Sequence, residues 1–237
     1  MKRAGSALLV VPLLVGCGSS VDTSAPLPSV AASTPQPTRH APPPPTTTPS
    51  VTPKARKTPT PTPQQVTLAD LVVPSRTFTR TSTRAWDRER TGPFDTERFA
   101  KLLSGTPDED RRLFNTTGFV RGHVSIRMAA DDRRLVIYLY QFRTHEGAVR
   151  LQKNFWDQYE HGDSFTVRGL GRTWTDAGLK QSSTRYTATA NVNFAVGNIL
   201  VKVDVTESNT TGKGLRPDTE LAAAIARQQR DHLAGAV

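Results

Sequence analysis

The sequence is poor in cysteine, since Cys17 is the only one in 237 residues. A single cysteine excludes an internal disulfide and a zinc cluster built on cysteines. Proline is also scarce in most of the chain, because fourteen of the 18 prolines lie at or before Pro63. A segment so dense in proline cannot form a packed core. The sequence therefore predicts one folded domain of 172 residues, at positions 66–237.

The folding region also lacks the short patterns that mark common catalytic and metal sites. Its four histidines show neither an i,i+4 pair nor a His-Glu-x-x-His spacing, and no serine lies in a Gly-x-Ser-x-Gly turn. Gly169 and Gly171 are not part of a phosphate-binding glycine pattern. The acidic run at 108–110 fits the first turn of a helix, where the dipole favours anions. We expect no catalytic residue, no metal and no cofactor.

The amino terminus carries a leader-like pattern. Lys2 and Arg3 precede the apolar run 7–15, which is too short to span a bilayer as a helix and fits the apolar part of a signal peptide. The run ends in Leu-Val-Gly-Cys17, which resembles the bacterial lipobox. The resemblance implies a signal peptide at 1–16 and a diacylglyceryl group on Cys17, and two acyl chains hold a protein stably on a membrane. A secretory signal with an incidental cysteine is the alternative.

Residues 17–65 read as a disordered stalk. They are almost entirely Ser, Thr, Pro, Ala and Val, without a hydrophobic period. Alternating Thr-Pro favours polyproline II, so the stalk can reach on the order of 100 Å. Four basic residues against Asp22 make it mildly basic, which favours contact with anionic wall polymers or lipid head groups.

Two hairpins are predicted in the folding region. Apolar and polar residues alternate over 186–196, Gly197-Asn198 supplies a two-residue turn, and 199–205 returns with the same alternation. An earlier hairpin pairs 123–128 with 134–142 across a turn at 130–133. The strand 134–142 is apolar on both faces, which predicts a central strand covered on both sides.

Helices are predicted after each hairpin and before the first one. Thr144 caps a helix with an apolar stripe, and another begins at Pro217 or Asp218. Asp95 caps a short helix, and Thr106 begins a capping box. The sum is an α+β domain, with an antiparallel sheet of four to five strands and helices mainly on one face. The order also predicts a hairpin–helix duplication, 119–160 and 184–235.

Two features are candidates for ligand binding. Arginines at a spacing of four alternate with threonines, which favours a strand with its arginines on one outward face. The loop 162–183 contains Trp174 among glycines and resembles a flexible lip over a pocket. A solvated strand face and a tryptophan in the core are the alternatives. The candidate residues are Arg76, Arg80, Arg84, Trp86, Arg88 and Trp174.

The whole layout resembles the lipobox-and-stalk lipoproteins of high-GC Gram-positive (actinobacterial) bacteria. The stretches 118–148 and 197–201 resemble extracellular sensor-like domains of those bacteria, including those attached to Ser/Thr kinases. The resemblance implies a lipid-anchored protein on the extracytoplasmic face of the cell membrane. An anchor and a stalk that carry a domain without a catalytic set favour a non-enzymatic, sensor-like module that binds an envelope component or small ligand. A wall-modifying hydrolase with a scattered site and a scaffold subunit of an envelope complex are the alternatives.

Charge agrees with a partner in the envelope. The net charge is +10 for the whole chain, and 25 basic against 20 acidic residues leave +5 in the folding region. Anionic cell-wall polymers or an envelope protein are therefore expected partners besides the membrane, and this moderate charge does not require nucleic acid.

Overall fold

The computed structural model of the protein describes residues 66–158 and 160–236. Cys17, the predicted signal peptide and the predicted stalk lie outside the described residues. Within them, seven antiparallel strands form one sheet in the order β1-β3-β4-β7-β6-β5, and β2 pairs with β3 beside this path. The strands are β1 (Arg80–Thr81), β2 (Gly92–Phe94), β3 (Phe119–Met128), β4 (Arg134–Phe142), β5 (Thr173–Gln181), β6 (Tyr186–Val196) and β7 (Ile199–Asn209).

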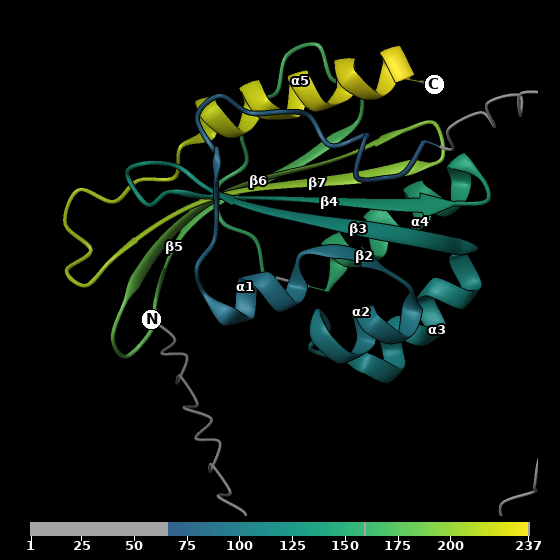
Figure 1. Ribbon diagram of the computed structural model, residues 1–237, viewed down its shortest axis with the longest axis horizontal. Coiled ribbons are helices and arrows are strands. Elements are labelled where there is room, and N and C mark those ends of the chain that lie inside the picture. Colours follow the sequence, from purple (N-terminus) through teal and green to yellow (C-terminus); the bar gives the residue numbers. More distant parts are fainter. Residues whose placement is uncertain (1–65, 159, 237) are drawn as a thin grey trace, which may run out of the picture. The chain divides into compact units, whose positions relative to one another are not determined.

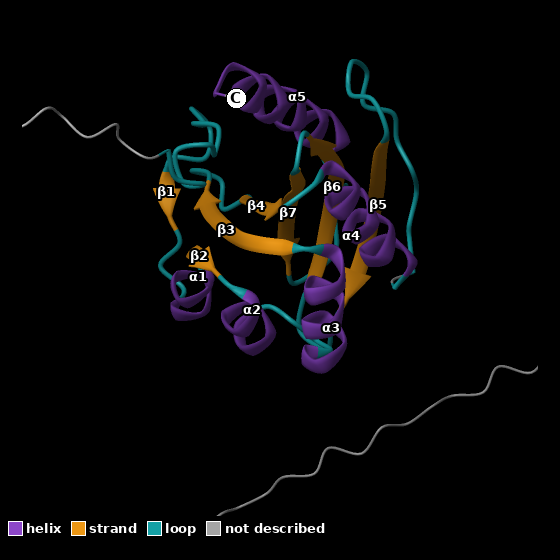
Figure 2. Ribbon diagram, turned by 90° about the vertical axis from the view of Figure 1, so that its right-hand side faces the viewer, coloured by secondary structure: helices purple, strands orange, loops and turns teal. Residues whose placement is uncertain are grey.

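Helices lie on both faces of this sheet (Figures 1 and 2). They are α1 (Ala85–Arg90), α2 (Thr96–Leu102), α3 (Pro107–Thr117), α4 (His145–Asp157) and α5 (Thr219–Ala236). One apolar cluster joins α5 to the sheet, and a second joins α2, α3 and α4 to the opposite face. Among the described residues, three helices thus pack on one face and α5 alone on the other, which agrees with the prediction of helices mainly on one face. An apolar residue on each face of β4 requires two covers, and α5 provides the second one.

Both predicted hairpins are confirmed. β3 pairs with β4, and β6 pairs with β7 up to Val196 opposite Ile199, on either side of the Gly197-Asn198 turn. β4 pairs with β7, so the two hairpins join in the centre of the sheet. As predicted, β4 is covered on both sides: Ile137 packs in the cluster of α5 and Val136 in that of α4.

The predicted count of four to five strands is too low. β1 and β2 are only two and three residues long, which is too short to display a period. β5 is nine residues long but breaks the apolar alternation, because Trp174 points to the opposite face from Ala177. The loop expected at 162–183 therefore contains an edge strand.

Three of the predicted helix starts are capped as expected. Asp95 accepts a hydrogen bond from the backbone N–H of Arg98 at 2.8 Å, and Asp218 accepts one from Leu221 at 3.0 Å. Thr144 also caps α4, through the N–H of Gly147. The capping box expected at Thr106 is wrong, since its side chain makes no cap bond at the start of α3.

The segment before β1 belongs to the core even though it has no regular structure. Leu71, Val73 and Phe78 are buried against the face that α5 covers. Gln229 of α5, fully buried, accepts from the N–H of Val73 at 2.9 Å and donates to the carbonyl of Leu71 at 2.7 Å. One side chain thus satisfies two buried backbone groups of this segment.

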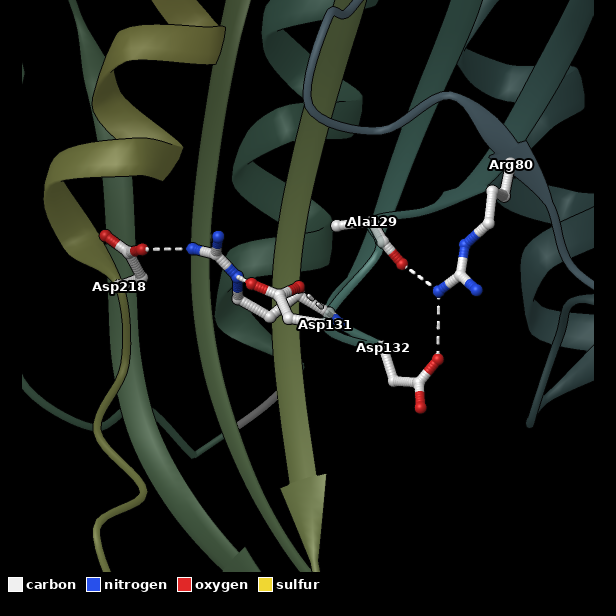
Figure 3. A network of polar contacts seen from close by, with 6 residues as sticks. Arg80, Ala129, Asp131, Asp132 and Asp218 are labelled. Atoms are coloured by element: carbon white, nitrogen blue, oxygen red, sulfur yellow. Dashed lines mark hydrogen bonds and ion pairs between the residues drawn. The ribbon is translucent and has the colours of Figure 1, made fainter.

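The β3–β4 turn ties three parts of the chain together (Figure 3). The Arg80 guanidinium donates to the carbonyl of Ala129 and to Asp132 at 3.0 Å. Arg133 pairs with Asp131 and, at 2.9 Å, with Asp218 at the start of α5. The turn therefore anchors β1 on one side and α5 on the other.

Candidate functional site

The face of the sheet opposite α5 contains a cleft of about 440 Å³, which we call the polar cleft. Its floor comes from four neighbouring strands, and its walls come from α4 and from the end of α2 with the start of α3. The residues that carry its chemistry are Ser104, Asp110, Arg134, Tyr138, Tyr140, Gln152, Trp156, Glu160, His161, Asp176, Lys180, Thr189, Asn191, Asn193, Lys202, Asp204 and Thr206.

Strand register places the polar side chains of the floor in rows. Asn191 of β6 lies opposite Asp176 of β5 on one side and Asp204 of β7 on the other. Asn193 in turn lies opposite Lys202. Directly opposite residues in antiparallel strands project from the same face at close range. Each row therefore presents donors and acceptors side by side over adjacent strands.

Asp204 is the most constrained acid of the floor. Its side chain is 14% exposed, and Lys202 lies 3.4 Å from its Oδ2. Its Oδ1 is buried and has no hydrogen-bond partner within residues 66–158 and 160–236. A buried acceptor without a partner is costly, so this oxygen marks a place where a ligand donor would be favoured.

A second acid, Asp110, lies in the wall. It is buried, and Ser104 donates to its Oδ2 at 2.5 Å. Burial raises the pKa of Asp110, nearby Glu109 adds to the rise, and the hydrogen bond from Ser104 offsets part of it. This carboxyl therefore keeps its proton to a higher pH than an ordinary aspartate and can donate a hydrogen bond.

Aromatic rings close one end of the polar cleft. Trp156 of α4 stacks on His161 with ring centroids 3.6 Å apart, and Trp174 of β5 lies 5.4 Å from Trp156. Burial raises the pKa of Tyr138, so its phenol stays neutral beside Lys202. Gln152 donates to the carbonyl of Asn193 at 2.9 Å, which fixes α4 above β6.

The structure does not form the predicted arginine strand. β1 contains only Arg80 and Thr81, and residues from Ala85 form α1, so the arginines do not share one strand face. Arg80 and Arg84 line a separate groove of about 330 Å³. Arg76 and Arg88 are exposed and do not line it.

The predicted tryptophans lie apart from each other. Trp86 is 57% exposed on α1, with the Arg90 guanidinium 3.4 Å above its ring. Trp174 is partly buried and packs against Trp156, beside the polar cleft. The six predicted residues therefore do not form one site: two line the groove, one borders the cleft and three are exposed elsewhere.

Comparisons with known proteins found little similarity to this chain. No protein-family model matches the chain, and no curated protein matches it. Among solved structures, the extracellular domain of PknH from Mycobacterium tuberculosis matches over 57% of this chain and 73% of that chain. The identity is 14% and the TM-score is 0.33, so this likeness decides nothing about function.

The chemistry of the site thus follows from its own residues. Within the described ranges, no three His, Cys, Asp or Glu side chains gather so that they could hold a metal ion. Nor does any helix there have the length and apolar character needed to cross a membrane. The polar cleft offers hydrogen-bond donors and acceptors of both charges, which suits the recognition of a polar ligand.

The polar cleft residues were missed at the sequence level for a specific reason. Thr189, Asn191 and Asn193 occupy the polar side of an alternating strand, and such a side ordinarily faces solvent. In the structure α4 and the α2–α3 connection rise over this side and turn it into the floor of a cleft. The only sequence signal was the matching polar face of β7, with Lys202 and Asp204.

Proposed function

We propose that this protein is a lipid-anchored, extracytoplasmic lipoprotein whose domain binds a polar envelope component or small ligand in the polar cleft, without catalysis. The observation that carries the proposal is the floor of the cleft, where register aligns the polar side chains of four strands inside a cavity of about 440 Å³. Small-molecule sites of proteins are commonly about 300–1,000 Å³ in volume.

The lining describes the kind of ligand that would bind. Three basic residues, Arg134, Lys180 and Lys202, are interspersed with four acids. A ligand with donors and acceptors, or with charges of both signs, would satisfy such a lining, whereas a purely apolar one would leave it unpaired. The unpartnered Oδ1 of Asp204 points to a donor group on the ligand.

Gly178 supplies a sharp test of this site. It lies in the floor, and a Cβ added there would meet no atom within 4 Å. Gly178→Leu should therefore fill the cleft with little loss of stability. Leu179, 52% exposed on the opposite side of the same strand, supplies the matched control Leu179→Ser.

The measurement is thermal unfolding of the full chain with N-acetylglucosamine, muramyl dipeptide and individual amino acids as probes. A probe at 100 times its Kd stabilises the native state by about 2.7 kcal/mol, which corresponds to a rise in Tm of roughly 5–10 °C for a domain of this size. We expect this rise for the wild type and Leu179→Ser and its loss in Gly178→Leu. An equal rise in Gly178→Leu would place the ligand elsewhere and contradict the proposal.

The lipid anchor is tested separately. Cys17→Ala should remove the anchor and release the protein from the membrane, or stall it as a precursor. Labelling with a radioactive fatty acid and partitioning into detergent both measure this. Unchanged membrane partitioning of Cys17→Ala would contradict the lipid anchor and leave the cleft proposal untouched.

One observation favours a second candidate, an envelope hydrolase. Asp110, whose pKa is raised by burial, lines the same cleft as Asp176 and Asp204, and a pair of carboxyl groups in one cleft is what glycoside hydrolysis uses. Release of soluble fragments from purified cell wall tests it. Activity that Asp110→Asn abolishes would establish the hydrolase and overturn the non-catalytic proposal.

No comparable observation favours the alternative of a scaffold subunit in an envelope complex. It needs an exposed apolar patch. The exposed large apolar side chains within the described ranges come from four separate parts of the chain: Val66, Trp86 of α1, Val120 of β3 and Leu179 of β5.

A further inference from the structure

The groove that Arg80 and Arg84 line has a composition unlike that of the polar cleft. We call it the arginine groove. It gathers four arginines, one acid, five hydroxyl side chains and a single apolar residue from β1, the β1–α1 link, the ends of β3 and β7, the β3–β4 turn, the start of β4 and the residue before β6. The residues that line it are Arg80, Thr81, Ser82, Thr83, Arg84, Met128, Asp132, Arg134, Arg185, Thr206 and Ser208.

Two of the four arginines are already paired. Arg80 pairs with Asp132 at 3.0 Å, and Arg134 pairs with Asp87 at 2.7 Å. Asp87 is only 2% exposed and lies behind the wall of the groove, where Ser82 also donates to it at 2.7 Å. These two pairs hold the groove in shape and leave little charge for a ligand.

The other two arginines carry the excess charge. Arg84 and Arg185 are exposed, and neither guanidinium forms an ion pair or hydrogen bond with another described residue. The charge of Asp87 reaches Arg84, but that carboxylate is bonded to Arg134. Four arginines thus face two carboxylates, which leaves two positive charges in one groove.

Hydroxyl groups complete the set of donors. Thr81 and Thr83 precede Arg84 in the chain, and their hydroxyls have no hydrogen-bond partner among residues 66–158 and 160–236. Guanidinium groups present their N–H donors in a planar fork that matches oxyanions. Two such forks with free hydroxyls suit a doubly charged group with three terminal oxygens better than a carboxylate, which has two oxygens and one charge.

We infer that the arginine groove binds a phosphate group, with Arg84 and Arg185 as its principal ligands and the hydroxyls of Thr81 and Thr83 as further donors. The phosphate can belong to a soluble phosphomonoester or to a lipid with a phosphomonoester head group, such as phosphatidic acid, since both present three terminal oxygens. Arg134 and Thr206 also line the polar cleft, so the groove adjoins it. The inference does not depend on the cleft ligand and goes beyond the proposed function.

The test measures binding of inorganic phosphate and glycerol 3-phosphate to the purified full chain by calorimetry. We expect a Kd of about 1 mM or below. Arg84→Gln and Arg185→Gln should each weaken binding roughly tenfold or more, because each removes charge-assisted hydrogen bonds. Arg88→Gln is the matched control: it removes the same charge from α1 at an exposed position outside the groove, and it should change the affinity less than about twofold.

Two outcomes would overturn the inference. One is the absence of phosphate and glycerol phosphate binding at about 10 mM, a concentration well above the expected Kd. The other is an equal loss in Arg88→Gln and Arg84→Gln, which would indicate a general charge effect. Thermal unfolding of each variant without phosphate verifies that the groove variants are folded.

Further measurements distinguish a lipid phosphate from a soluble one, and the arginine groove from the polar cleft. Vesicles that contain phosphatidic acid, compared with vesicles of phosphatidylcholine alone, test the lipid head group, and binding that exceeds that of free glycerol phosphate assigns the site to the membrane surface. Binding of glycerol phosphate without vesicle binding assigns it to a soluble phosphomonoester. Gly178→Leu should bind phosphate like the wild type, so a failure of the cleft proposal and a failure of this one give different results.

Discussion

The buried pair of Asp87 and Arg134 provides a prediction that can be worked out in detail. Asp87→Asn keeps the shape of the side chain and its hydrogen bond from Ser82 but removes the charge that faces Arg134 at 2.7 Å. Breaking a fully buried ion pair costs about 3–5 kcal/mol. Because the Arg134 side chain is 22% exposed and keeps some contact with water, we expect a loss on the order of 2–4 kcal/mol.

The matched control is Asp132→Asn. Asp132 also pairs with an arginine, Arg80, but its side chain is 86% exposed. An exposed pair contributes little, so we expect less than about 1 kcal/mol. Asparagine also tolerates the positive φ of 65° at this position, so the backbone should not change.

The assay is thermal and urea unfolding of both variants. For a domain of this size, each kcal/mol corresponds to roughly 2–4 °C in Tm, so Asp87→Asn should lower the Tm by roughly 4–16 °C, several times the effect of Asp132→Asn. Equal effects of the two substitutions would refute the argument from burial.

The pH dependence provides a second criterion. Burial alone would raise the pKa of Asp87, but the hydrogen bonds from Arg134 and Ser82 and the charge of Arg134 outweigh it, so the pKa is lowered. A lowered carboxyl pKa stabilises the native state above the unfolded pKa of about 4, and this contribution is lost as the pH falls through the folded pKa. The difference between wild type and Asp87→Asn should be constant from about pH 5 to 8 and shrink below about pH 4. A difference that persists unchanged at about pH 2 would refute the electrostatic origin.

Three further substitutions test a buried hydrogen-bonding side chain, a close backbone approach and a buried carboxyl group. Gln229→Ala leaves two buried backbone groups unpaired and should lower the free energy of unfolding by about 2–4 kcal/mol in urea, whereas the exposed neighbour Gln228→Ala should be nearly neutral. Gly122→Ala would place its Cβ 2.0 Å from the ring of Phe94, so we expect a loss of about 1–3 kcal/mol and a disturbed aromatic cluster in the NMR spectrum. The raised pKa of Asp110 means that its ionisation destabilises the fold as the pH rises through the folded pKa, so Asp110→Asn should stabilise the protein at pH 7 by about 1 kcal/mol and lose this advantage below about pH 4. No gain at pH 7 would contradict the last of these.

The predictable part of the fold is the part that local pattern determines. The β6–β7 hairpin has an unbroken alternation and a glycine turn, and its register follows from them. The double apolar face of β4 likewise predicted a strand covered on both sides, which the two clusters confirm. The prediction of one strand for the arginine segment was wrong, because spacing alone does not distinguish a two-residue strand followed by α1 from one long strand.

The candidate sites could not be predicted because they depend on sheet order rather than on turns. Arg84 and Arg185 are far apart in the chain, and only the pairing of β1 with β3 and of β4 with β7 brings their segments to one groove. The β4–β7 pair is not a hairpin, since α4, β5 and β6 intervene, and no local residue encodes it. It follows instead from two apolar faces that must each be covered, by α5 on one side and by α2, α3 and α4 on the other. Because α4 and the α2–α3 connection rise beside the polar side chains in the middle of β5, β6 and β7, these side chains become the floor of a cleft, whereas alternation alone describes them only as a face toward water.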